Sequence, residues 1–351
     1  MKKAGGGRRG VGGALRAVGG RRWAVAAAAL RAPASVVALG LLTAAGIAAC
    51  ASQLPRMPSI GRATVDKVWP EALLDTTRRI AVVDEFTQPE AVRYDADQDL
   101  YFVANFGSGE TQAMDNNGFI SLLRPDGSMM SLRFIAGGEE GVTLHAPRGM
   151  TIVADTLWVA DNGAVRGFNR LTGRPVASID MTSFGAGFLN DIAAGPGGAL
   201  YVTDTPRNRV YRIVRRTATL AVADSALNNP NGIAWDDWNS RFVIVPYGGA
   251  HTLFAWSEGN SLTPFATSPG GKFDGIEVLG PNDLLVASQA DTMLHRFVSG
   301  TGRAVIRTSG RPADIALDTR RMRVAVPFIA LNRVEIWQLP RIDEESAAAN
   351  P

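Results

Sequence analysis

Residues 230–246 have the sequence PNGIAWDDWNSRFVIVP, in which a short motif opens an apolar strand and a polar turn leads to a second apolar strand. Short apolar runs rich in branched and aromatic residues and bounded by turn residues predict strands rather than helices. Five more stretches with this plan occur beyond residue 78, so this part of the chain is repetitive. A repeat of this length decides the fold before any single element is assigned.

The opening motifs recur about every forty residues. Their second positions are 90, 148, 190, 231, 274 and 313, so the first interval is longer than the others. Each interval has room for four short strands, which is the composition of one propeller blade. The sequence therefore predicts an all-β fold, a six-bladed β-propeller, with a β-helix or two β-sandwiches as the alternatives. The second residues of the motifs are Glu90, Arg148, Asn190, Asn231, Asp274 and Ala313.

The last repeat is incomplete. It supplies only three strands, the last at residues 333–339, before a polar tail. The segment 79–86 precedes the first blade, alternates in polarity and has no partner of its own. Placed as the outermost strand of the sixth blade, it would cover an open sheet edge and close the ring. We therefore expect an N-terminal strand in the last blade.

The first fifty residues predict export. Residues 1–49 hold eight Lys/Arg and no acid, and the rest of the chain has 28 basic and 33 acidic residues, a net charge of −5. The overall charge of +3 is thus a feature of the leader and gives no reason to expect nucleic-acid binding. An apolar stretch from Ala34 ends in Ile47-Ala48-Ala49-Cys50, which resembles the bacterial lipobox. An uncleaved membrane anchor, or a chance Cys after an ordinary signal, is the alternative.

These features predict four segments. They are a lipoprotein signal peptide at 1–49, a tether at 50–78, the propeller at 79–340 and a polar tail at 341–351. Lipid on Cys50 would hold the protein in the bacterial cell envelope, facing the periplasm or the exterior. Cys50 is the only Cys, so no internal disulfide can form and stability must come from packing. We expect a monomer.

The six motif positions are expected to meet at the central axis, because the first strand of each blade lines the channel. Five of them are polar, which is costly in a narrow channel unless the side chains pair, hold water or bind an ion. Two carboxylates and two amides offer oxygen ligands for a hard divalent cation, Ca²⁺ or Mg²⁺, with Zn²⁺ or Mn²⁺ as alternatives. The chain has no serine-hydrolase elbow, phosphate-binding loop or zinc-protease motif.

The motifs Pro89-Glu90, Asn190-Asp191, Pro230-Asn231-Gly232 and Asp274-Gly275 resemble the senescence marker protein (regucalcin) and gluconolactonase-like family of six-bladed propellers. The resemblance covers about residues 85–340. It implies that Glu90, Asn231 and Asp274 bind a catalytic divalent metal and that Asn190 lies near the substrate. The family often has an Arg two residues before that Asn, where this chain has Phe188. Arg148 is the candidate for the missing positive charge, or else a counter-ion for Glu90 or Asp274.

The resemblance implies an extracytoplasmic metal-dependent hydrolase whose small-molecule substrate is a lactone or another ester. The metal would act on the carbonyl, and Asp274 or a metal-bound water would transfer the proton. The alternative is a non-catalytic binding propeller of the NHL type displayed on the membrane. Its repeats share openings such as Pro230-Asn231-Gly232-Ile233 and endings such as Tyr201-Val202-Thr203-Asp204. In that case the motif residues cap turns and tie blades together.

The long first repeat predicts a lid. Its extra residues fall at 106–118 and 136–146, on the face where the motif residues open. His145 in the second insertion is a candidate acid or base near the substrate, with a solvated loop histidine as the alternative. Four residues that end second strands near the same rim are candidate substrate contacts: Asn105, Asn162, Tyr247 and Gln289.

Overall fold

The computed structural model describes residues 78–339, which contain 24 β-strands and only short 3₁₀ turns besides. The chain divides into two units, residues 1–62 and 63–351, and all described residues belong to the second. The predicted signal peptide, Cys50, most of the tether and the tail lie outside the described residues. Within residues 78–339, no helix has the length and apolar character needed to cross a membrane.

The strands form four sheets of four strands and one sheet of eight. Three of the four-stranded sheets follow the chain as simple antiparallel meanders. Their strands are β2 (Pro89–Asp95), β3 (Leu100–Asn105), β4 (Phe119–Leu123) and β5 (Met129–Ala136); β6 (Met150–Val153), β7 (Thr156–Asp161), β8 (Ala164–Asn169) and β9 (Pro175–Asp180); and β10 (Leu189–Ala194), β11 (Leu200–Asp204), β12 (Arg209–Val214) and β13 (Thr217–Ala223).

The eight-stranded sheet consists of two such meanders joined at their outer edges. The halves meet through one parallel pair, Thr267 and Thr301, and every other pairing lies within a half. The first half is β14 (Pro230–Asp236), β15 (Arg241–Pro246), β16 (Thr252–Trp256) and β17 (Thr263–Thr267); the second is β18 (Phe273–Gly280), β19 (Asp283–Ser288), β20 (Met293–Val298) and β21 (Thr301–Arg307).

The remaining sheet joins the two ends of the described chain. Its order is β1 (Arg78–Val83), β24 (Arg333–Gln338), β23 (Arg323–Phe328) and β22 (Ala316–Asp318). The predicted pairing of the N-terminal strand with the last strand is confirmed, with Val83 opposite Val334. The innermost strand, β22, has only three residues, and just before it Asp314 exchanges backbone hydrogen bonds with Glu90 and Val92 of β2.

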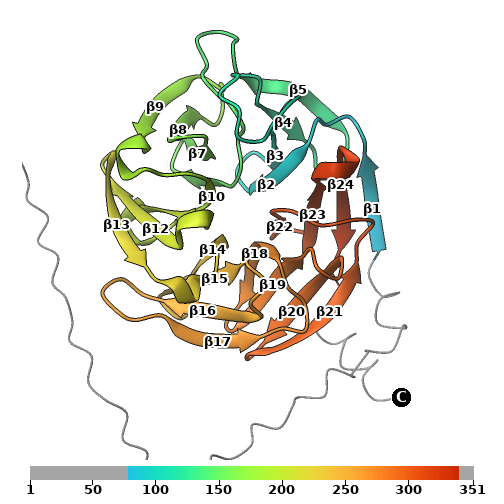
Figure 1. Ribbon diagram of the computed structural model, residues 1–351. Helices are drawn as coiled ribbons and strands as arrows, with labels where there is room; N and C mark the ends of the chain where they lie inside the picture. Colours follow the sequence, from blue (N-terminus) through green and yellow to red (C-terminus); the bar gives the residue numbers. More distant parts are fainter. Residues whose placement is uncertain (1–77, 340–351) are drawn as a thin grey trace, which may run out of the picture. The chain divides into compact units, whose positions relative to one another are not determined.

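The innermost strands form a closed circuit. Each contacts the innermost strand of the next meander, in the order β2, β6, β10, β14, β18 and β22, and β22 contacts β2 again. Figure 1 shows the meanders arranged around this circuit, with their outermost strands β5, β9, β13, β17, β21 and β1 at the periphery. The fold of the described residues is therefore an all-β, propeller-like arrangement.

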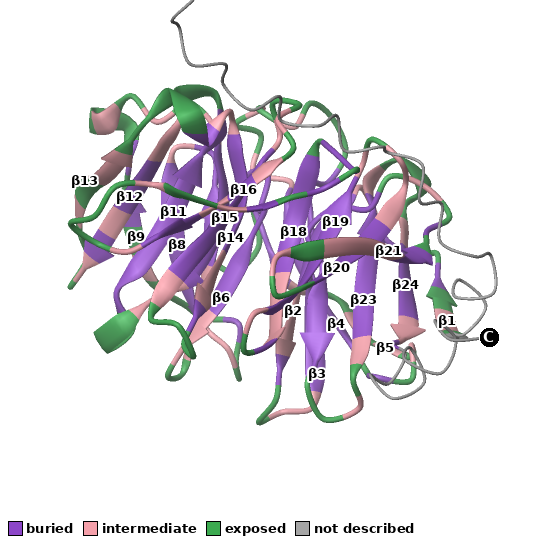
Figure 2. Ribbon diagram, turned by 90° about the horizontal axis from the view of Figure 1, so that it is seen from below, coloured by how far each residue is buried: buried purple, intermediate pink, exposed green. Residues whose placement is uncertain are grey.

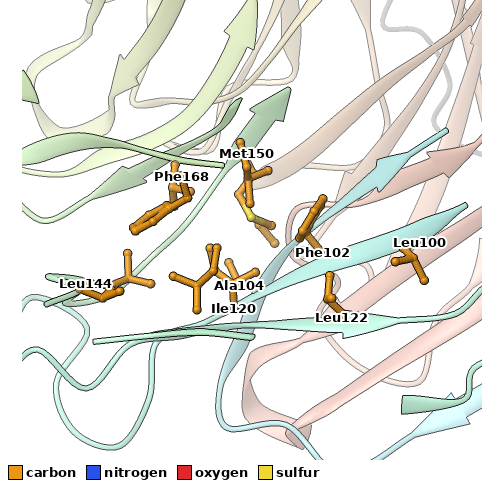
Figure 3. Packing of buried hydrophobic residues seen from close by; sticks show 13 residues of the cluster. Leu100, Phe102, Ala104, Ile120, Leu122, Leu144, Met150 and Phe168 are labelled. Atoms are coloured by element: carbon orange, nitrogen blue, oxygen red, sulfur yellow. The ribbon is translucent and has the colours of Figure 1, made fainter. Parts of the chain in front are cut away.

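The hydrophobic core is divided among the contacts between neighbouring meanders. Met150 and Phe168 of the second meander pack against Phe102, Ala104 and Ile120 of the first (Figure 3). The two halves of the eight-stranded sheet also pack through a cluster of this kind. Figure 2 shows that burial is concentrated in the inner and middle strands, whereas loops and outer strands are partly exposed. Packing of sheet faces against neighbours thus fixes the innermost strands, which carry the motif residues.

Candidate functional site

The predicted motif residues lie together at one end of the innermost strands, which we call the motif end. Glu90, Asn190, Asn231 and Asp274 are the second residues of β2, β10, β14 and β18, and all four are buried. Arg148 lies two residues before β6 and Ala313 three residues before β22, and both are fully buried. A parallel bridge between Ala91 and Asp314 shows that the first and last of these strands run in the same direction.

Asp274 is positioned by side chains from the rim. Gln289, which follows β19, donates a hydrogen bond of 2.6 Å from Nε2 to Asp274 Oδ2, and Tyr247 donates to Gln289 Oε1 at 3.1 Å. Asp274 Oδ1 is buried without a hydrogen-bond partner. Burial and the charge of Asp191 raise the pKa of Asp274 to about 8, against the hydrogen bonds from Gln289 and Asn231. The ionised form of Asp274 is therefore disfavoured, and a nearby cation would stabilise it.

Glu90 lies in the same negative environment. Its pKa is raised well above the usual range by burial and by the charge of Asp274, and the charge of Arg148 opposes this shift. Glu90 Oε2 is buried and has no hydrogen-bond partner. The side chain of Asn231 is close enough to Asp274 to lower its pKa, so the structure brings the three predicted metal ligands into one neighbourhood.

Two further carboxylates, Asp191 and Asp314, occupy the third position of their opening motifs. Asp191 accepts hydrogen bonds from the backbone N–H of Ile192 at 2.6 Å and of Ile233 at 2.8 Å, so it connects two meanders. Both carboxylate oxygens of Asp314 are buried without partners. The pKa of Asp314 is raised mainly by burial and further by the charge of Asp191. The sequence signal for both residues is an acid at the third position of the third and sixth motifs.

Arg148 binds a loop as well as balancing charge. Its guanidinium lies 3.8 Å from the ring centre of Phe188. Arg148 Nη2 donates to the carbonyl of Thr111 at 2.6 Å and to Asn162 Oδ1 at 2.8 Å. Burial lowers its pKa to about 10, while the charge of Glu90 acts in the opposite direction. Arg148 therefore faces Glu90 and also anchors the first insertion.

Asn190 has one engaged and one available polar atom. Its Nδ2 donates to Thr205 Oγ1 at 3.0 Å, and that hydroxyl donates to the carbonyl of Pro230 at 2.8 Å. No donor to Asn190 Oδ1 is present among residues 78–339. This carbonyl oxygen is thus free to accept a hydrogen bond from a ligand at the motif end.

His145 is buried rather than solvated. Its ring Nδ1 accepts a hydrogen bond from the backbone N–H of Asn116 at 3.0 Å, and the backbone N–H of His145 donates to the carboxylate of Asp161. The alternative of a solvated loop histidine is therefore wrong, because the second insertion folds back onto the first. The role of His145 as an acid or base near a substrate stays a prediction.

The other rim predictions divide into two groups. Three of them are linked to the motif end by hydrogen bonds. Gln289 donates to Asp274 and accepts from Tyr247, and Asn162 accepts from Arg148. Asn105 instead accepts from Thr87 N–H and donates to Ser121 Oγ within its own meander. Its contacts are those of a turn-stabilising residue.

The candidate ligand atoms at the motif end fit a hard divalent cation. Glu90 and Asp274 each hold a buried oxygen without a partner, and Asn231 adds an amide, so all candidate ligand atoms can be oxygens. No group of three or more His, Cys, Asp or Glu side chains within residues 78–339 is arranged to hold a metal. A site here would therefore depend on the amide as well as the two carboxylates.

Comparisons with known proteins support the fold. No protein-family model and no curated protein matches the chain. A virginiamycin B lyase from Staphylococcus aureus is 14% identical with a TM-score of 0.55, covering 75% of this chain and 99% of that one. A Xanthomonas campestris gluconolactonase is 17% identical with a TM-score of 0.55 and coverages of 75% and 91%. The calcium-binding protein regucalcin from Agrobacterium tumefaciens is 15% identical with a TM-score of 0.52 and coverages of 77% and 88%. At these identities the likeness shows that the chain has the fold of these propeller proteins.

Proposed function

We propose that the protein is a divalent-cation-dependent hydrolase of the lactonase type. The observation that carries this proposal is the pair of buried, unpartnered carboxylate oxygens on Glu90 and Asp274, close to the amide of Asn231. Two of the structural neighbours are described as a gluconolactonase and a calcium-binding protein, which supports the same chemistry. The cation is of the Ca²⁺ or Mg²⁺ class, with Zn²⁺ and Mn²⁺ as alternatives.

Each residue at the motif end has a proposed task. Glu90, Asn231 and Asp274 bind the cation, which when bound supplies Lewis-acid polarisation of a carbonyl. Water adds to the carbonyl carbon while Asp274 takes its proton, and Asp274 returns a proton to the alkoxide when the ring C–O bond breaks. The free oxygen of Asn190 and the guanidinium of Arg148 orient the substrate, and His145 connects the second insertion to Asn116 of the first.

A non-catalytic binding propeller is the second candidate. It is favoured by the contacts of Arg148 and Asn162, which hold the carbonyls of Thr111 and Ala113 against the motif end. In a binder this covering loop would be permanent. In a hydrolase it must open for each substrate.

The test is a hydrolysis assay on the purified full chain. After chelation, the protein is supplied with Ca²⁺, Mg²⁺, Mn²⁺ or Zn²⁺ and given a panel of aldonolactones and simple γ- and δ-lactones. We expect cation-dependent turnover that falls at least about 100-fold in Glu90→Gln. The matched control is Glu85→Gln, which removes an exposed carboxylate just before the first meander. Turnover that survives in Glu90→Gln, or is absent with every cation, would reject the hydrolase.

We further propose that the eight-stranded sheet serves as two blades, giving six in total. Support comes from its single joining pair and from the hydrophobic cluster between its halves. Thr267→Gly and Thr301→Gly weaken the two strands at the pair that joins them and should leave both halves folded, as judged by hydrogen exchange of their inner strands. Loss of protection throughout both halves would indicate one continuous sheet.

Attachment to the cell envelope through lipid on Cys50 and a monomeric state complete the proposal. The support is the sequence Ile47-Ala48-Ala49-Cys50 after an apolar stretch. Cys50→Ala should move the protein from the membrane fraction to the soluble fraction, and mass spectrometry should show the loss of acyl chains. An unchanged membrane fraction would favour an uncleaved anchor.

A further inference from the structure

A cavity lies at the opposite end of the innermost strands, which we call the far end. It has a volume of about 270 Å³ and is lined by Arg93 of β2, Thr151 of β6, Trp235 of β14 and Glu277 of β18, with Trp238 in the β14–β15 turn. Glu277 follows Asp274 by three residues on β18, which corresponds to about 10 Å along a strand. The far-end cavity is therefore distinct from the motif end.

An ion pair forms the polar wall of this cavity. Arg93 Nη1 lies 3.1 Å from Glu277 Oε1, and the two side chains are 21% and 15% exposed. Arg93 Nε donates to the carbonyl of Met150 at 2.7 Å, while no acceptor for Nη2 is present in the described part of the chain. The wall thus offers both a hydrogen-bond donor and a carboxylate acceptor, with equal and opposite charge.

The charges around the ion pair disfavour charged ligands. An anion at Arg93 would meet Glu277 and the carboxylates of Asp191 and Asp314, which all act on the guanidinium. A cation would compete for Glu277 with the guanidinium of Arg93, which lies 3.1 Å from its carboxylate. A neutral ligand with several hydroxyl groups can accept from the guanidinium and donate to the carboxylate without breaking the pair.

Two tryptophans belong to the apolar lining of the cavity, beside aliphatic side chains such as Ile192 and Ile276. Trp238 is 59% exposed, although large aromatic side chains are usually covered. Trp235 is held in place by an edge contact with Phe242, with ring centres 4.8 Å apart, and by a hydrogen bond from Nε1 to Asp237 at 3.1 Å. An indole face beside paired polar groups matches a ring that has an apolar face and a hydroxylated rim.

We propose that the far-end cavity binds a neutral polyhydroxylated molecule about the size of one sugar ring. The indole of Trp238 covers the C–H face of the ring, and Arg93, Glu277 and Thr151 bind its hydroxyl groups. The cavity is smaller than those that hold drug-sized ligands, which agrees with a single ring. This inference does not depend on the activity proposed for the motif end.

Saturation-transfer NMR on the full chain tests the proposal. The probes are glucose, galactose, mannose and myo-inositol, with choline as the cationic probe and acetate as the anionic probe. We expect saturable binding of at least one polyol, weakened about tenfold or more in Trp238→Ala and restored in part by Trp238→Phe. Leu220→Ala removes another exposed apolar side chain, on β13, and should have no effect.

Three outcomes would overturn the proposal. One is the absence of saturable binding by every polyol, and another is binding of choline or acetate alone. The third is polyol binding that Trp238→Ala leaves intact but Asp274→Asn abolishes, since this would place the ligand at the motif end. Circular dichroism of each variant checks that the fold is retained.

Discussion

At the scale of single residues, the third position of each opening motif sets how closely innermost strands approach. A Cβ on Gly232 would collide with the backbone oxygen of Asp274, and one on Gly275 would collide with the backbone nitrogen of Ile315. The neighbouring strand therefore occupies the space that a side chain would need. Where the motif has Asp191 instead, the carboxylate bridges to the N–H of Ile233 in the next meander.

Gly232→Ala should destabilise the protein by about 1–3 kcal/mol, because the added methyl group forces two packed strands apart. The control is Gly280→Ala at the end of β18, where the nearest atom to the new Cβ is 3.9 Å away. Urea unfolding of both variants gives the comparison. Equal stability of the two variants would show that the strands are not packed as closely as described.

Asp314 makes stability depend on pH in the cation-free protein. Its pKa is raised by burial and by Asp191, so its contribution is fully present below the unfolded value of about 3.9 and is lost as pH rises. In chelator, Asp314→Asn should raise the free energy of unfolding at pH 8 by more than about 1.4 kcal/mol, the equivalent of one pKa unit, and by less at pH 5. The exposed Asp237→Asn is the control; a gain from Asp314→Asn that does not grow with pH would contradict the assignment.

At the scale of elements, the segment 106–118 is held to the motif end by few contacts. Asn162 Nδ2 donates to the carbonyl of Ala113 at 2.9 Å, and Asn162 Oδ1 receives Arg148. Asn162→Ala should therefore speed hydrogen exchange of residues 107–117 several-fold while β3 and β4 stay protected. Exchange that is unchanged in this segment would mean that other contacts hold it closed.

A buried ion pair joins the first two meanders. Arg170 Nη1 lies 2.7 Å from both carboxylate oxygens of Asp95. Burial raises the pKa of Asp95, but hydrogen bonds from Gln98 and Arg170 outweigh this effect and lower it. The contribution is present above the unfolded value of about 3.9 and is lost as pH falls below it.

Arg170→Met should accordingly cost about 1–3 kcal/mol at pH 7. The difference from the unmodified protein should shrink as the pH is lowered towards 3, where Asp95 becomes protonated in the unfolded chain. Guanidinium unfolding at a series of pH values measures this. A deficit that stays constant with pH would show that lost packing, not the ion pair, is responsible.

At the scale of the whole molecule, the features that were predictable from the sequence are those that the repeat determines. The spacing of motifs such as Pro230-Asn231-Gly232 located the innermost strands, and the unpaired segment at 79–86 predicted the pairing of β1 with β24. Contacts that depend on insertions were not predictable, because no repeat fixes where a loop returns. The burial of His145 and the contact of Arg148 with Thr111 belong to this class. Asp191 and Asp314 were missed because only one position of each motif was compared.

Binding of one divalent cation by Glu90, Asn231 and Asp274 together is what the proposed hydrolase requires. Crystals of the full chain grown with Mn²⁺ and measured for anomalous scattering test it most directly. We predict one strong peak within about 2.0–2.6 Å of an oxygen of each of the three side chains, and its loss in Asp274→Asn crystals. A map with no peak there, or with the three side chains turned towards neighbouring loops, would contradict the account.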